Sequence, residues 1–292
     1  MSADTPPDAR GPDRVLAALD ISDYAAAVVR YAGWAACRLE APLELLHVQD
    51  GDDLPASLYP GEVDVDPRFV LLRQLERERA AGAPAQTPGE RLLQRACDFV
   101  HTEFGIAARP SLRDGDLART LQADEGATRL YVIGKRGEYA NIDSDHLGSQ
   151  LEKVVRAVHR PLLVTSRHFQ PPQRVLVAFD GSALAGMGLD AIAAGALFGD
   201  LDMRVLMVGN DEPPRQQQLQ QALDTLQRHG HRAEGRIRRG PVDATILREI
   251  DDAQADLVVM GAYGHSRLRR MLFGSTTNHV LRTSKVPVLL LR

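Results

Sequence analysis

Arg14-Val-Leu-Ala-Ala-Leu-Asp20 and Arg174-Val-Leu-Val-Ala-Phe-Asp180 are two copies of one segment, separated by 160 residues. Each is a short aliphatic run that ends on an aspartate, which is typical of a buried parallel strand. The next pair, Leu43-Glu-Leu-Leu-His-Val48 and Met203-Arg-Val-Leu-Met-Val208, keeps the same separation. The chain therefore contains an internal repeat, and the repeat determines the fold.

The later strands of the two copies stand closer together. Arg129-Leu-Tyr-Val-Ile-Gly134 matches Asp256-Leu-Val-Val-Met-Gly261 at a separation of 127, and Pro161–Val164 matches Pro287–Leu290 at 126. The first copy must therefore contain about 33 additional residues, which we place mainly between Gln49 and Gly105.

This additional segment is expected to hold more helix than its counterpart. Residues 51–66 are rich in Asp, Pro and Gly and indicate a loop. Residues 67–81 and 89–104 have the periodicity of two amphipathic helices, whereas the second copy shows one helix here, at about 214–230.

Helices that alternate with apolar strands predict βαβ units and a parallel sheet. We expect an α/β fold of two tandem Rossmann-like domains, each a five-stranded parallel sheet of order 3-2-1-4-5 with helices on both faces. The first domain is predicted at residues 1–165, with a helical insertion at about 51–104. A linker follows at 166–172, and the second domain occupies 173–292. The apolar last strands, Leu162–Val164 and Val288–Leu290, should join the domains as an intrachain pseudo-dimer, and two chains could dimerise further.

Composition narrows the class of partner. The 35 basic and 39 acidic residues give a net charge of -4, which offers no electrostatic reason to expect nucleic acid. No run of about 18 apolar residues occurs that would predict a membrane span. The start of the chain, MSADTPPDARGP, lacks the apolar core of a signal peptide. The two cysteines, Cys37 and Cys97, lack CxxC spacing and are interpreted as reduced thiols, which favours a cytoplasmic protein.

The motif that indicates chemistry lies in the second copy. Its spacing is Gly261-x2-Gly264-x9-Gly274-Ser275, followed by Thr276 and Thr277 at a predicted helix start. Glycine lets the backbone approach a sugar or phosphate without a Cβ in the way. Hydroxyls and free N–H groups at a helix amino terminus favour an anion. The spacing therefore predicts a phosphate-binding loop, although glycine at a strand end and serine at an N-cap are individually common.

Two further features are open to two interpretations. Asp180-Gly181-Ser182 ends the first strand of this copy and is also good turn chemistry. His265 and Arg267 put positive charge in the loop. Arg269 and Arg270 do the same, but paired loop arginines are more often solvated surface than phosphate contacts.

These residues together resemble the universal stress protein family, in its ATP-binding branch and tandem two-domain form. The resemblance covers nearly the whole chain. It implies ATP, ADP or AMP as the ligand, with Mg²⁺ as an accompanying ion. It also implies that the strand-one aspartate and its neighbours contact adenosine, that backbone at the end of strand two bonds the adenine, and that the glycine loop holds ribose and phosphates. Carried onto this sequence, the predicted binding residues are Asp180, Gly181, Ser182, Val208, Met260, Gly261, Gly264, Gly274, Ser275, Thr276 and Thr277.

The first copy departs from this pattern. It reads Gly134-Lys-Arg-Gly137-x10-Gly148-Ser149, and its loop carries Glu138, Asp143 and Asp145. Carboxylates close to a triphosphate repel it by about 1 kcal/mol or more per pair at intermediate dielectric. Ser149 and Glu152 also form a capping-box pattern that would satisfy the helix donors internally. We expect a weakened, altered or empty site, unless Lys135 and Arg136 compensate.

No catalytic constellation and no metal site are predicted, because no Walker A, G-x-S-x-G or H-E-x-x-H sequence occurs. The sequence favours a nucleotide-binding regulatory protein of the stress response, in which occupancy biases conformation or partner binding. At most it is a weak ATPase. The alternatives are an adenine-nucleotide-dependent enzyme, and a scaffold that binds a protein or apolar ligand through the first-domain insertion.

Overall fold

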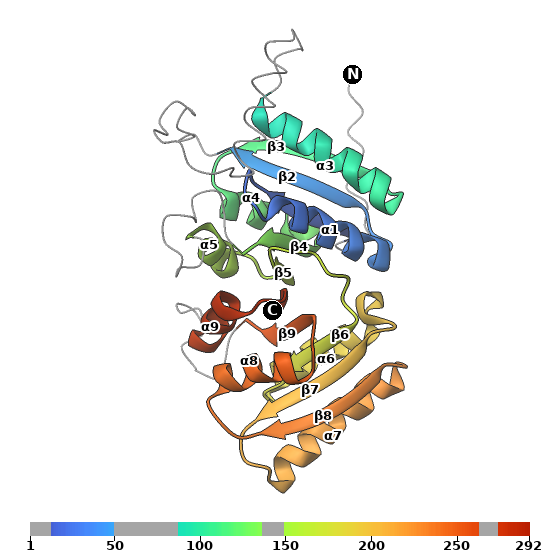
Figure 1. Cartoon of the computed structure of the whole chain (residues 1–292), viewed down its shortest axis with the longest axis vertical. Coiled ribbons are helices and arrows are strands. Elements are labelled where there is room, and N and C mark those ends of the chain that lie inside the picture. The colour runs from blue at the N-terminus through green and yellow to red at the C-terminus, as the bar shows by residue number, and fades with distance from the viewer. Residues whose placement is uncertain (1–12, 50–86, 136–148, 263–273) are drawn as a thin grey trace.

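The computed structural model describes residues 13–49, 87–135, 149–262 and 274–292, and Figure 1 draws the remaining residues as a thin grey trace. The first copy consists of β1 (Arg14–Leu19), α1 (Ala25–Leu39), β2 (Leu43–Gln49), α3 (Pro88–Phe104), β3 (Ala108–Asp114), α4 (Leu117–Ala123), the 3-10 turn η2 (Glu125–Ala127), β4 (Thr128–Gly134), α5 (Ser149–Ala157) and β5 (Leu162–Thr165). The second consists of β6 (Arg174–Ala178), α6 (Ala183–Ala194), the 3-10 turn η3 (Ala196–Phe198), β7 (Asp202–Val208), α7 (Pro213–Arg228), β8 (Arg232–Arg238), α8 (Val242–Asp252), β9 (Leu257–Gly261), α9 (Ser275–Thr283) and β10 (Val288–Leu291).

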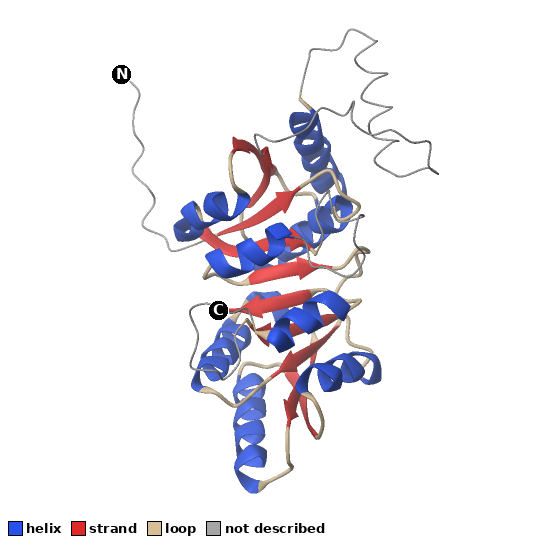
Figure 2. Ribbon diagram, turned by 90° about the vertical axis from the view of Figure 1, so that its left-hand side faces the viewer, coloured by secondary structure: helices blue, strands red, loops and turns tan. Residues whose placement is uncertain are grey.

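The strands form one sheet in the order β3-β2-β1-β4-β5-β10-β9-β6-β7-β8. Each half has the predicted order 3-2-1-4-5, and all neighbours within a half are parallel. The halves join edge to edge where β5 and β10 pair antiparallel, with Leu163 opposite Leu289. The expected contact between the last strands is therefore present, as a continuous ladder across the middle of the molecule (Figures 1 and 2).

Both faces of this sheet are covered by helices, which explains why its inner strands are mostly apolar, whereas the outermost strands β3 and β8 are more polar. Within β1, Val15 and Leu19 enter one core, while Leu16 enters the other. The first core receives α1, α3, α6 and α7, and the second receives α4, α5, α8 and α9. Each core contains residues of β5 and β10, so the two copies share their interior.

α3 is the first copy's version of α7. Each helix precedes the third strand of its copy and packs against it. The helix predicted at 89–104 is therefore present, but it is not additional to the second copy. This narrows the insertion, expected at about 51–104, to chain before residue 87. The helix expected at 67–81 lies outside the described residues.

The segment between the copies is held by the first one. The Tyr31 hydroxyl on α1 lies 3.3 Å from the Ser166 hydroxyl, and its ring meets that of Phe169 edge-on, with centroids 4.8 Å apart. Arg38 of the same helix donates to the Leu197 carbonyl of η3 at 2.7 Å and pairs with Asp200. α1 thus holds both the linker and the second copy.

Candidate functional site

The predicted binding residues come from three segments that lie at the carboxyl ends of neighbouring strands. β6 lies between β9 and β7, and Ala178 is in register with both Met260 and Leu206. The chain order reverses at β6, and ligands of open α/β sheets bind at such a point, outside the carboxyl ends of the strands. The fold therefore brings Asp180, Val208 and Gly261 to one place.

The loop after β6 is fixed by local hydrogen bonds. The exposed Asp180 carboxylate accepts from the Ser182 N–H at 2.9 Å. The Ser182 hydroxyl accepts from the Ala185 N–H at 3.1 Å and so caps α6. Gly181 has a φ of +76°, which a side chain would oppose. Asp180 is thus a turn residue, and its position at the switch point leaves the binding role open to it as well.

Val208 is the last residue of β7 and lies past the point where β7 pairs with β6. The last backbone bond between these two segments runs from the Phe179 N–H to the Leu206 carbonyl, at 2.9 Å, whereas the Gly209 N–H bonds to β8. Because successive residues of a strand point their backbone groups to opposite sides, the Val208 N–H and C=O face the β6 side. Among the described residues no backbone group meets them there. This is the arrangement that recognition of a base edge by backbone requires.

The third segment joins β9 to α9. Met260 is buried, and α9 begins at Ser275 after Gly274, with no side-chain cap at its amino terminus. The first N–H groups of a helix have no intrahelical acceptor, and the helix dipole makes this end attractive to an anion. Ser275 is exposed and Thr276 is half-buried, so both can reach a ligand.

Thr277 has a structural task that the sequence did not predict. Its side chain is 3% exposed, and its hydroxyl donates to the Gly261 carbonyl at 3.3 Å. A hydroxyl carries a single proton, so this one is not available for a phosphate oxygen. Thr277 fastens α9 to the end of β9 and can offer a phosphate only its backbone N–H.

Gly264 and the basic residues His265, Arg267, Arg269 and Arg270 lie outside the described residues. The same holds for the acidic positions Glu138, Asp143 and Asp145 of the first copy, and for Gly137, Gly148 and the Ser149 side chain. Their predicted roles stay predictions.

Sequence reasoning missed two side chains on α7. The Gln218 side-chain amide donates to the Gly181 carbonyl at 3.3 Å, and the Arg215 guanidinium donates to the Asn210 carbonyl at 2.5 Å. Both therefore lie beside predicted binding segments. The one signal in the sequence was their spacing of three residues, which puts them on the same face of a helix that follows strand two.

The first copy is built differently at the same place. Asp20, the counterpart of Asp180, accepts from the Ser22 hydroxyl at 2.5 Å. Burial raises the pKa of the Asp20 carboxyl, against the opposing effect of the Ser22 hydrogen bonds and of nearby His47. His47 is itself buried, with Nδ1 2.8 Å from the Leu19 carbonyl, and Gly89 of α3 packs on its ring. This corner is more enclosed than the exposed loop at Asp180.

Lys135 binds the other copy. It follows the first copy's Gly134, and its Nζ donates to the Ser284 carbonyl at the carboxyl end of α9, at 2.9 Å. One donor of this ammonium group is therefore used by α9, and the compensation by Lys135 and Arg136 stays a prediction.

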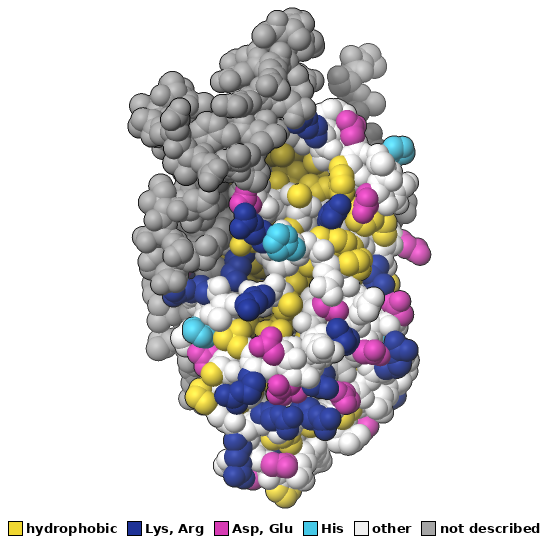
Figure 3. Space-filling model, in the orientation of Figure 1, with side chains coloured by type: hydrophobic (Ala, Val, Ile, Leu, Met, Phe, Trp, Pro, Cys, Tyr) yellow, Lys and Arg dark blue, Asp and Glu magenta, His cyan; other side chains and the backbone are white. Residues whose placement is uncertain are grey.

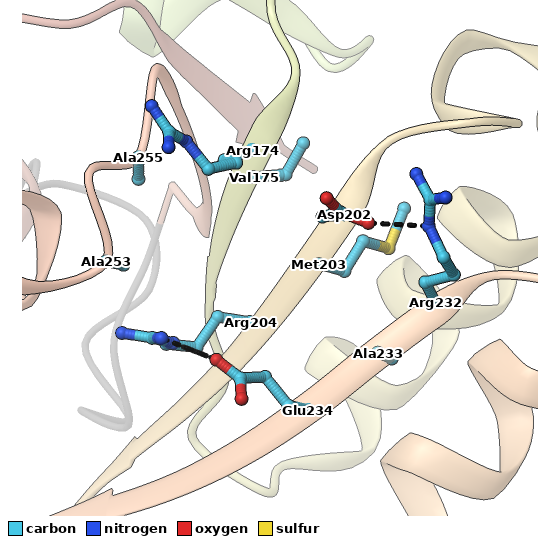
Figure 4. A pocket seen from close by; sticks show the side chains of 10 residues that line it. All are labelled: Arg174, Val175, Asp202, Met203, Arg204, Arg232, Ala233, Glu234, Ala253 and Ala255. Carbon is cyan, nitrogen blue, oxygen red and sulfur yellow. Dashed lines mark hydrogen bonds and ion pairs between the residues drawn. The ribbon is translucent and has the colours of Figure 1, made fainter.

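A hollow of about 400 Å³ lies at the opposite end of the strands of the second half (Figure 4). It is bounded by the amino ends of β6, β7 and β8. Asp202 pairs with Arg232 at 2.6 Å and Arg204 with Glu234 at 2.5 Å along its wall. This hollow is distinct from the predicted nucleotide site.

The outer surface shows no segregation of charge over the second copy on the face in Figure 3, where basic and acidic side chains are interspersed. No helix among the described residues is long and apolar enough to cross a membrane. The same residues contain no group of three His, Cys, Asp or Glu side chains that could hold a metal ion.

Known proteins match both halves of the chain. The model of the universal stress protein family matches residues 12–166 and 172–292. A universal stress protein of Synechocystis is 31% identical over 284 residues, covering 95% of this chain and 99% of its own. One of Mycolicibacterium smegmatis is 25% identical over 304 residues, covering 95% and 96%. The crystal structure of a universal stress protein from Archaeoglobus fulgidus covers 96% of this chain and 98% of its own, with 20% identity and a TM-score of 0.70.

Proposed function

Because the chain belongs to the universal stress protein family, we propose that it is a cytoplasmic regulatory protein of the stress response that binds one adenine nucleotide in its second domain. The observation that supports this most is the meeting of three segments at the switch point of the second half. An exposed aspartate loop, the outward backbone of Val208 and the uncapped start of α9 lie there together.

Each segment has a role that suits its chemistry. Asp180, Gly181 and Ser182 would hold the ribose side of the nucleoside, since the Ser182 hydroxyl still has its proton to donate. The Val208 N–H and C=O would select the base edge. Gly261, Gly264 and Gly274 would let backbone approach the phosphates, which lie against the first N–H groups of α9 with Ser275, Thr276 and Thr277. A Mg²⁺ ion would arrive with the triphosphate, held mainly by phosphate oxygens.

The first domain is proposed to leave its site empty of nucleotide. Two observations support this: Asp20 and His47 form a more enclosed corner than the exposed Asp180 loop, and Lys135 bonds to the Ser284 carbonyl. The first domain would then serve as a support for α9 and for any partner that senses occupancy.

Equilibrium dialysis with labelled ATP tests the proposal on the full chain. We expect one site per chain, lost or weakened about tenfold or more in Asp180→Ala, as for removal of a group hydrogen-bonded to the ligand. The matched variant Asp20→Ala should keep wild-type stoichiometry. Two equivalent sites per chain, or equal loss in both variants, would contradict the assignment.

The enzyme alternative is tested in the same preparation. Release of phosphate or of pyrophosphate is measured over hours with and without an acceptor. A regulatory binder should show at most slow hydrolysis, whereas rapid release of AMP and pyrophosphate would favour a nucleotidyl-transferring enzyme.

A further inference from the structure

Two side chains of α7 bind the loops that follow β6 and β7. Arg215 and Gln218 are three residues apart and therefore project from one face of the helix. Gln218 reaches the Gly181 carbonyl after β6, and Arg215 reaches the Asn210 carbonyl after β7. They therefore lie next to the loops that follow both strands, near Asp180 and Val208.

Both side chains lie directly on glycine backbone. A Cβ at Gly209 would stand 2.5 Å from the Arg215 Cζ, and one at Gly181 would stand 2.7 Å from the Gln218 Oε1. The two glycines have φ values of +150° and +76°, which side chains rarely adopt. The glycines therefore give the guanidinium and the amide room to rest against the loops that hold Val208 and Asp180.

The first copy has neither group at the matching places. The buried residues Leu93, Ala96 and Val100 of α3 correspond to Leu219, Ala222 and Leu226 of α7. This match puts Gly89 at the place of Arg215 and Leu92 at that of Gln218. Gly89 packs on the ring of His47, and Leu92 packs against the core. Neither place holds a cation or an amide in the first copy.

Position separates these two residues from the phosphates. The phosphate end of the proposed site is the start of α9, which follows β9, whereas Arg215 lies beyond β7 on the other side of β6. Strands lie about 4.8 Å apart, so β7 and β9 are separated by about 10 Å. A group beside β7 therefore meets the base end of a nucleotide that lies across β6.

We propose that Arg215 and Gln218 form the outer wall of the base pocket and set its preference for a nucleotide over a bare polyphosphate. The planar Arg215 guanidinium covers the face of the purine, an arrangement that attracts a cation to a π-system and suits arginine better than lysine. The Gln218 amide closes the pocket between the base and the Gly181 loop. This inference rests on the proposed nucleotide site and adds to it the residues that recognise the base.

The test compares two ligands, ATP and inorganic tripolyphosphate, on the full chain. Arg215→Ala and Gln218→Ala should each weaken ATP binding, by about three- to tenfold for the arginine, as expected for a lost cation–π contact. Competition by tripolyphosphate for the same site should be unchanged. Arg215→Lys keeps the charge without the planar group and should stay weak.

Matched controls lie on the same helix. Arg228→Ala and Gln220→Ala remove an arginine and a glutamine whose bonds go to Asp224 and Thr225, away from the site. They should bind ATP as the wild type does, and thermal midpoints of all variants should confirm that α7 is folded.

The outcomes separate the two proposals. No ATP binding by the wild type would overturn the proposed function. Wild-type binding that Arg215→Ala and Gln218→Ala leave intact would overturn only the base wall. Equal loss of ATP and tripolyphosphate, or full rescue by lysine, would show a simple charge contact and contradict the role in base recognition.

Discussion

Thr277 illustrates how one hydroxyl joins the two elements that flank the candidate site. Its side chain is buried, and its hydroxyl donates to the Gly261 carbonyl, which links the first turn of α9 to the end of β9. A buried carbonyl that loses its donor costs about 1–3 kcal/mol.

The variant Thr277→Val keeps the shape of the side chain and removes only the bond. We expect the free energy of unfolding to fall by about 1–2 kcal/mol and the affinity for ATP to fall with it, because α9 is no longer held in place. Urea denaturation and titration with ATP measure the two effects. Thr277→Ser retains the hydroxyl and should retain ATP binding. Unchanged stability and affinity in the valine variant would contradict this role.

Burial of Asp20 makes the stability of the chain depend on pH. Burial raises the pKa of its carboxyl above the ordinary 3.8. Well below pH 3.8 the group is protonated in both the folded and the unfolded chain, and the folded chain is then most stable with respect to Asp20. As pH rises from 3.8 through the raised pKa, ionisation favours the unfolded chain, so the free energy of unfolding falls.

Asp20→Asn removes this charge while its side-chain oxygen can still accept from the Ser22 hydroxyl. The variant should be more stable than the wild type at neutral pH, and the difference should vanish toward pH 3.8. Urea denaturation at several pH values tests the sign. A variant that is less stable at neutral pH, or a difference that does not vary with pH, would show that burial does not dominate here.

Local chemistry explains which site residues the sequence could predict. Asp180 and Ser182 bond to residues two and three positions away, so their turn and cap were readable from three letters. Arg215 and Gln218 meet Gly209 and Gly181 through tertiary packing, which no local pattern encodes. The hydrogen bond from Lys135 to the Ser284 carbonyl of the other copy could not be predicted for the same reason.

At the scale of elements, α9 is held at both ends by different parts of the chain. Thr277 ties its start to β9, and Lys135 of the first copy donates to the Ser284 carbonyl at its end. A cation at the carboxyl end of a helix is favoured by the helix dipole. The helix whose start faces the proposed phosphates is therefore anchored in the other domain.

Lys135→Met removes the donor and keeps the length of the side chain. We expect a loss of about 1 kcal/mol in the free energy of unfolding, with one ATP still bound per chain. Lys153→Met, on the exposed face of α5, is the matched control and should leave stability unchanged. A loss of ATP sites in Lys135→Met, beyond what weaker folding explains, would instead place this lysine on a phosphate.

The structural equivalence of α3 and α7 could not be predicted from the sequence pattern alone. The periodicity located both helices to within two residues, yet their equivalence became visible only through the strand each one packs on. Amphipathic periodicity gives the buried face of a helix and not its partner.

At the scale of the whole molecule, the described strands form one sheet, and each of its two cores contains residues of both domains. Unfolding of one domain is therefore expected to affect the other. Repeat spacing and apolar strands sufficed to predict the order 3-2-1-4-5, because βαβ units allow few topologies. The apolar last strands indicated the joining edge. Because Leu163 and Leu289 are paired and both buried, opening this seam would expose apolar surface of both halves.

A ligand bound in one half should therefore stabilise the other. The chain has one tryptophan, Trp34, which is 8% exposed on α1 of the first domain. It lies near Arg38, the residue that donates to the Leu197 carbonyl of η3. Its fluorescence reports unfolding of the half that is proposed to bind no nucleotide.

ATP at about one hundred times its dissociation constant stabilises a folded protein by about 2.7 kcal/mol. If both halves unfold together, the urea midpoint measured at Trp34 should rise with ATP, and Asp180→Ala should abolish the rise. A Trp34 midpoint that ignores ATP, while calorimetry shows a second transition that responds to it, would mean that the seam between β5 and β10 opens before the domains unfold.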